Sequence, residues 1–151
     1  MGSSYYVGAA HPPEVELATP EDLTRSIVRD IQEGAQGTDI KAGIIGEVGC
    51  SWPLTERERK VLEASARAQQ ITGAPLLIHP GRGEKAPIEI LDILSKSGGD
   101  LARTIIGHID RTVFSKDTLK QIAGTGCYLE WDLFGREESY YFQKPTVDMP
   151  G

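Results

Sequence analysis

Apolar positions along this chain form short runs and helical stripes that alternate, and glycine or proline separates one from the next. Runs with strand character cover residues 5–9, 42–47, 75–78, 104–107 and 127–132. Between them, apolar residues recur every three or four positions, the period of an amphipathic helix, in residues 20–31, 55–73, 88–94 and 115–122. The pattern predicts about five strands and four helices in strict alternation.

Two of the predicted helices begin with recognisable capping residues. Thr19 precedes Pro20 and two acidic residues, the order of an N-cap followed by proline at the first helical position. Thr55 stands three residues before Glu58, which is the spacing of a capping box. Both helices are therefore expected to start where these residues stand.

The predicted strands are apolar without a two-residue alternation, which indicates a parallel sheet with both faces buried. Two architectures fit such a sheet. A five-stranded doubly wound domain suits a length of 151 residues, and length alone favours it. A (β/α)8 barrel takes roughly 250 residues, so this chain would form only part of one.

Composition adds limits on the class of protein and its partners. Hydrophobic residues make up 39% and charged residues 25%, as in soluble globular domains. No apolar stretch approaches the roughly 20 residues that cross a bilayer, and the first residues do not resemble a signal peptide. A net charge of −6 argues against nucleic acid. We expect a cytoplasmic protein without nucleic-acid or membrane partners, whose Cys50 and Cys127 are free thiols.

Three residues stand at the ends of three successive predicted strands. Glu47, His79 and His108 follow one another at about one strand–helix unit each. The carboxyl ends of parallel strands meet at one edge of the sheet, so these side chains should lie together. Two imidazoles and a carboxylate suit zinc and similar divalent metals. Separate structural roles are the alternative, but they leave the equivalent positions of the three residues unexplained. The sequence therefore predicts a metal site.

Other polar residues near these strand ends have two interpretations each. Arg82, in the loop after His79, would bind an anionic group of a substrate or be a solvated loop arginine. Asp110 and Arg111 would orient the imidazole of His108 or form a surface pair.

Tyr128 lies on the last predicted strand and is expected in the core. No arrangement typical of a serine or cysteine nucleophile is present, so no catalytic side chain is assigned.

Four segments carry a family resemblance: GIIGEVGCSWPLT at residues 43–55, IHPGR at 78–82, GHIDRT at 107–112 and GCYLEWDLFG at 126–135. They resemble the phosphotriesterase-related branch of the phosphotriesterase family, in the amidohydrolase superfamily. The resemblance implies part of a (β/α)8 barrel, about strands 3 to 7, with a centre for two divalent cations, usually zinc. By position it makes Glu47 the bridging carboxylate and His79 and His108 the ligands that end strands 5 and 6.

The same resemblance implies a hydrolase in which a hydroxide shared by the two cations attacks a carbonyl or phosphoryl centre. The resemblance also implies small substrates, either N-acyl taurines such as N-acetyltaurine or compounds like phosphotriesters. Arg82 is then a candidate for binding the sulfonate of an N-acyl taurine. The His-x-His pair of strand 1 and the aspartate of strand 8 have no match, and Asp132 does not fit the latter's motif. Residues 1–151 are thus expected to form a single incomplete domain that lacks strands 1, 2 and 8 and half of the ligands.

Two functions remain open at this point. The first is a zinc-dependent hydrolase that acts on an ester or an amide. The second is a catalytically inactive form that serves only as a binding or interaction module. A partial barrel has unpaired parallel edges, so self-association through these edges is expected in either case.

Overall fold

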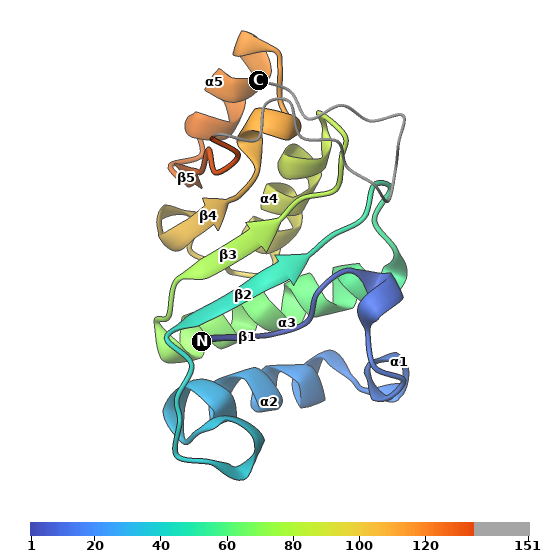
Figure 1. The fold of residues 1–151 in the computed structure, drawn as a ribbon, viewed down its shortest axis with the longest axis vertical. Coiled ribbons are helices and arrows are strands. Elements are labelled where there is room, and N and C mark those ends of the chain that lie inside the picture. Colours follow the sequence, from blue (N-terminus) through green and yellow to red (C-terminus); the bar gives the residue numbers. More distant parts are fainter. Residues whose placement is uncertain (135–151) are drawn as a thin grey trace.

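The structure is a computed structural model that describes residues 1–134. A parallel five-stranded sheet forms its centre, and the spatial order of the strands is their order along the chain (Figure 1). The strands are β1 (Gly2–Ser3), β2 (Ile44–Gly49), β3 (Leu76–His79), β4 (Thr104–Ile106) and β5 (Tyr128–Leu129).

Within residues 1–134, five α-helices connect these strands: α1 (Glu14–Leu17), α2 (Pro20–Gln32), α3 (Glu56–Thr72), α4 (Ala86–Lys96) and α5 (Lys116–Ala123). Both predicted caps are present. The Thr19 hydroxyl accepts a hydrogen bond from the Asp22 amide, and the Thr55 hydroxyl accepts one from the Glu58 amide. Each satisfies an amide that the first turn of a helix leaves without a partner.

The sequential strand order decides between the two predicted architectures. A doubly wound sheet of this size reverses its strand order near the first strand, because helices cover both of its faces. Here every strand pairs with the next one in sequence, and α3 and α4 both lie behind the sheet in Figure 1. The doubly wound alternative, favoured by length, is wrong, and the order is that of consecutive units of a barrel.

The hydrophobic core lies between the sheet and the helices. Ile78 and Ile106 from the sheet and Leu62 from α3 have no exposed surface. The residues that alternate with them, Leu77 and Ile105, are only partly buried. The prediction of strands buried on both faces is therefore wrong within residues 1–134, because helices cover one face only.

A bulge interrupts the pairing of β2 with β3. Ile45 pairs with Leu76 and Val48 with Ile78, so that two residues of β2 oppose one residue of β3. Ile45 and Val48 are both fully buried, which places Glu47 on the opposite face of the sheet. An unbroken alternation would have put Glu47 on the same face as Ile45.

Gly46 makes this bulge possible. Its φ is +126°, and a Cβ atom at this position would lie 2.4 Å from the carbonyl oxygen of Leu77. Only glycine fits both the conformation and the space.

The predicted first strand, residues 5–9, is wrong. The strand is Gly2–Ser3, and Gly8–Ala10 forms a short 3-10 helix. Beyond Ser3 the backbone leaves the ladder: the Tyr5 carbonyl accepts from the Gly49 amide, while the Gly8 amide donates to the Glu58 side chain. A side-chain carboxylate thus replaces the next strand partner, and the segment crosses the carboxyl end of the sheet.

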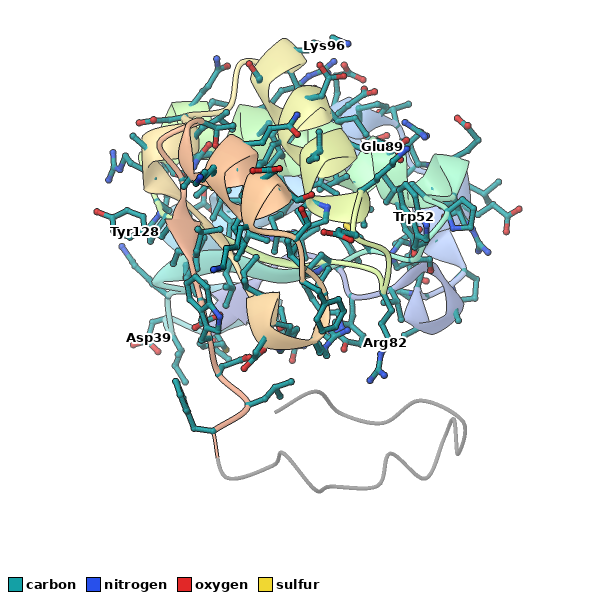
Figure 2. All side chains as sticks on the ribbon, turned by 90° about the horizontal axis from the view of Figure 1, so that it is seen from above. Asp39, Trp52, Arg82, Glu89, Lys96 and Tyr128 are labelled. Carbon is teal, nitrogen blue, oxygen red and sulfur yellow. The ribbon has the colours of Figure 1, made fainter. Side chains whose placement is uncertain are left out.

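The last predicted strand is shorter than residues 127–132, because its partner β4 ends at Ile106. Tyr128 is 64% exposed and not in the core, which corrects that prediction. It lies on the sheet face that no described helix covers, and Figure 2 shows it on the side of the molecule away from Arg82.

Cys50 and Cys127 are free, as predicted. Burial raises the pKa of the Cys50 thiol, with a smaller contribution from the Glu58 carboxylate, so this thiol stays protonated at neutral pH.

Among the described residues, no helix combines the length and the apolar character that crossing a membrane requires. The cytoplasmic location and the exclusion of nucleic acid stay predictions.

Candidate metal centre

Glu47, His79 and His108 meet at the carboxyl end of the sheet. Glu47 lies on the bulge of β2, His79 is the last residue of β3, and His108 follows β4. Glu47 Oε1 is 3.0 Å from both His79 Nδ1 and His108 Nε2, and these two nitrogens are 2.8 Å apart. The structure thus brings together the three residues that the strand ends predict. Their role as metal ligands stays a prediction.

The backbone turns sharply at His108, just after β4. Its φ of +55° is left-handed, a conformation that costs a residue with a side chain about 1–3 kcal/mol. The short helix Ile109–Arg111 follows at once, and the Ile109 amide donates to the carbonyl oxygen of Glu130. This bond to the segment after β5 holds the turn and points the imidazole over the end of the sheet.

The outer nitrogen of His108 has an acidic partner. His108 Nδ1 is 2.9 Å from Asp132 Oδ1 and 2.7 Å from Oδ2. Asp132 is held in turn by Asp110, whose Oδ2 accepts from the amides of Asp132 and Leu133. Asp110 therefore acts on His108 only through Asp132. The sequence analysis considered Asp132 only as a match for the aspartate of strand 8 and did not predict this contact with His108.

The outer nitrogen of His79 has a basic partner. Arg111 Nη2 is 3.0 Å from His79 Nε2, and Arg111 is buried with 8% of its surface exposed. The prediction that Arg111 orients His108 is replaced by a contact with the other histidine. Tyr6, which sequence reasoning also missed, places its hydroxyl 3.1 Å from Nε2 and 3.2 Å from Nδ1 of His79.

His79 in the cluster and Glu130 near it have shifted pKa values. Burial lowers the pKa of His79 to about 4; the Glu47 carboxylate opposes the shift, while His108 and Arg111 add to it. His79 is therefore neutral at pH 7, so only one of its two ring nitrogens carries a proton. Burial and the Asp132 carboxylate raise the pKa of Glu130, against the opposing effect of His108.

The donor set fits a divalent cation. Tetrahedral zinc with bonds of about 2.0–2.2 Å would place its ligand atoms about 3.3–3.6 Å apart, so these atoms, 2.8–3.0 Å apart here, would have to separate by only a few tenths of an ångström. Glu47 Oε1 and His108 Nε2 also face each other at 3.0 Å as two acceptors, because Nδ1 of His108 donates to Asp132. A bound cation, or the N–H at Nδ1 of His79, which is 3.0 Å from Glu47 Oε1 and 2.8 Å from His108 Nε2, would make this approach favourable.

Arg82 lies in the loop after β3 and is partly buried. Its side chain extends away from the helical layer in Figure 2. Its predicted contact with a substrate stays a prediction.

Glu58 joins the loops that border the cluster. It is fully buried at the start of α3, and its carboxylate accepts from the Gly8 amide at 2.8 Å, the Ser51 hydroxyl at 2.7 Å and the Thr55 amide at 2.9 Å. Burial raises the pKa of Glu58, but these hydrogen bonds outweigh it and leave the pKa below its ordinary value. Through Gly8, Glu58 fixes the segment that carries Tyr6.

Comparison with known sequences agrees with this geometry. The phosphotriesterase-related protein of Nematostella vectensis is 54% identical over 149 residues, and the N-acetyltaurine hydrolases of Homo sapiens and Bos taurus are each 50% identical. In each case the match covers 99% of this chain and 43% of the relative. The chain thus spans less than half the length of the relatives it matches.

Solved structures agree as well. The phosphotriesterase homology protein of Escherichia coli, crystallised with phosphate in its active site, superposes with a TM-score of 0.81 at 33% identity, covering 91% of this chain and 47% of that one. A resiniferatoxin-binding protein of Rhodobacter sphaeroides gives a TM-score of 0.92 at 32% identity, covering 100% and 42%. The partial (β/α)8 barrel is confirmed.

The family model described as the Phosphotriesterase family matches residues 1–149. Because this match spans nearly the whole chain and the relatives agree with it, the chain belongs to the phosphotriesterase family.

Proposed function

We propose that this chain provides the central part of the metal centre of a zinc-dependent hydrolase that cleaves an ester or an amide. One observation carries the proposal: three donor atoms on successive strand ends converge within 3.0 Å of one another in a chain of the phosphotriesterase family. The names of the relatives support a hydrolase, since several are N-acetyltaurine hydrolases.

The roles of the residues follow from their contacts. Glu47, His79 and His108 hold the cation, and Asp132 fixes the ring of His108 through Nδ1. Zinc bound there would supply Lewis acidity toward water and toward the carbonyl or phosphoryl oxygen of a substrate. In a complete centre Glu47 would be the carboxylate shared by two cations, as the family resemblance implies. Among residues 1–134 a single cluster of three such donors is found, which suits one ion.

The proposed substrates are small anionic amides or esters, N-acyl taurines such as N-acetyltaurine first and phosphotriester-like compounds second. We assign Arg82 to the anionic group, since a guanidinium pairs with a sulfonate in two parallel hydrogen bonds. Changing Arg82 to Ala should raise KM for the anionic amide far more than for a neutral ester. Equal increases for both compounds would contradict this role.

Metal analysis of the purified chain tests the proposal. At least one equivalent of zinc per chain that dialysis does not remove, together with turnover of N-acetyltaurine, supports the enzyme. A matched Glu47→Gln variant should then lose both zinc and turnover. No zinc at all, or an ion that dialysis removes, would refute the proposal for this chain.

A second function is an inactive binding module, favoured by the open sheet. We propose that residues 1–151 form a single incomplete barrel that lacks strands 1, 2 and 8. Within the described residues β1 and β5 each pair on one side only, and Tyr128 and Phe134 near β5 are 64% and 80% exposed. Such edges favour self-association. Sedimentation analysis tests this, since a stable monomer would contradict it.

A further inference from the structure

The contacts of Arg111 determine where the ring proton of His79 lies. A guanidinium has only N–H donors and is never deprotonated in a protein, so Nε2 of His79, 3.0 Å from Arg111 Nη2, must be the acceptor. A neutral imidazole has one ring proton, which is then on Nδ1. The hydroxyl of Tyr6 both donates and accepts, and it suits either arrangement.

The remaining contacts agree with this assignment. The N–H at Nδ1 of His79 faces two acceptors, His108 Nε2 at 2.8 Å and Glu47 Oε1 at 3.0 Å. His108 in turn donates from Nδ1 to Asp132. The hydrogen bonds therefore run in one direction, from the guanidinium of Arg111 through both imidazoles to the carboxylate of Asp132.

The two histidines consequently differ in whether the ring nitrogen that faces the cluster is free to bind a cation. Asp132 keeps the proton of His108 on the outer nitrogen, which leaves the lone pair of Nε2 directed at the cluster. Arg111 does the opposite to His79, because it occupies the outer nitrogen and leaves the proton on the inner one. For Nδ1 of His79 to bind a cation, the proton has to move to Nε2, where it would face an N–H of Arg111.

We propose that Arg111 is a positioning residue that holds the ring proton of His79 on the nitrogen facing the cluster and thereby weakens cation binding. The proposal rests on the proposed metal site. Binding a cation through Nδ1 then requires Arg111 to give up its hydrogen bond to His79. Arg111 thus sets the affinity of the centre without being a ligand.

Zinc affinity, measured by competition with a chromophoric chelator, tests this contrast. Arg111→Met should bind zinc about tenfold more tightly than the wild type, whereas Asp132→Asn should bind it about 10–100-fold more weakly. Arg25→Met is the control, because the Arg25 side chain is 74% exposed on α2, and its affinity should not change. Unchanged or weaker binding by a folded Arg111→Met variant would overturn the proposal.

The ring-nitrogen chemical shifts of His79 test the proton position without any metal or activity. In the wild-type chain before zinc is added, 15N spectra should give a protonated Nδ1 and an unprotonated Nε2. Arg111→Met should raise the share of the Nε2–H tautomer without completing the change, because Glu47 Oε1 and His108 Nε2 still accept from Nδ1. A protonated Nε2 in the wild type would refute the proposal even if the buried Arg111 cannot be replaced without unfolding. A chain that takes up no zinc refutes the proposed metal site, while these shifts still decide the role of Arg111.

Discussion

The two faces of the sheet have opposite properties. The face toward the helices consists of aliphatic side chains such as Ile45, Ile78 and Ile106, none of which is exposed. The other face carries Leu77 and His79, which are partly exposed, together with the charged Glu47. The first face supplies most of the buried apolar surface, and the second supplies the chemistry. Because Glu47 lies on the less tightly packed face, we expect that its exchange costs little stability.

The largest expected effect compares neighbours on the same strand. Ile78→Ala should lower the free energy of unfolding by about 2–5 kcal/mol, because it leaves a cavity in the packed face. Leu77→Ala, one residue earlier on the partly exposed face, should cost less than half as much. Urea unfolding of both variants measures the contrast. Equal losses would mean that the second face is packed as tightly as the first.

The second prediction concerns the bulge in β2, which places Glu47 on the face opposite the helices. Gly46→Ala should cost about 2–4 kcal/mol, since its Cβ would lie 2.4 Å from the Leu77 carbonyl oxygen at a φ of +126°. Gly43→Ala, just before β2, meets no atom within 4 Å and is the control, with a loss below about 1 kcal/mol. Thermal unfolding separates the two. Similar stability of both variants would show that the bulge is not needed.

The third prediction concerns Glu58, a fully buried carboxylate whose hydrogen bonds are satisfied. Glu58→Gln should cost about 1–3 kcal/mol at pH 7. The pKa of Glu58 is lower in the folded protein than its ordinary value of 4.5, so its contribution is present above that value and is lost as the pH falls through the folded pKa. The difference between wild type and variant should therefore shrink below about pH 4.5. A difference that is constant with pH would contradict this account.

The smallest effect on stability is expected at the cluster itself. Glu47 is 34% exposed and contacts only the two histidines among the hydrogen bonds described, so Glu47→Gln should change the free energy of unfolding by less than about 1 kcal/mol. Zinc affinity should nevertheless fall by more than the 10–100-fold typical of an outer partner. Paired unfolding and chelator-competition measurements check this. A large loss of stability would place Glu47 in the core and remove the distinction between the faces.

Much of the fold could be predicted from the sequence, because the sequence signals for helix ends and helix faces are local. Capping at Thr19 and Thr55, and the apolar stripes of α2 and α3, depend on residues within a few positions of one another. The prediction for residues 5–9 was wrong because their apolar character resembles that of a strand. In the structure the Tyr5 carbonyl accepts from the Gly49 amide and the Gly8 amide donates to the Glu58 carboxylate, and both partners are far along the chain. Distant hydrogen bonds leave no periodic trace in a sequence.

The sequence by itself determined which three residues meet, since the period of one strand and one helix repeats three times and parallel strands share an edge. Tertiary structure alone decided how they meet. The bulge at Gly46 reversed the side on which Glu47 emerges, and the turn at His108 selected Asp132 as the partner of that ring. Arg111, predicted for His108, reached His79 instead. Side-chain direction and partner choice depend on three-dimensional contacts between strands, and spacing along the chain does not encode them.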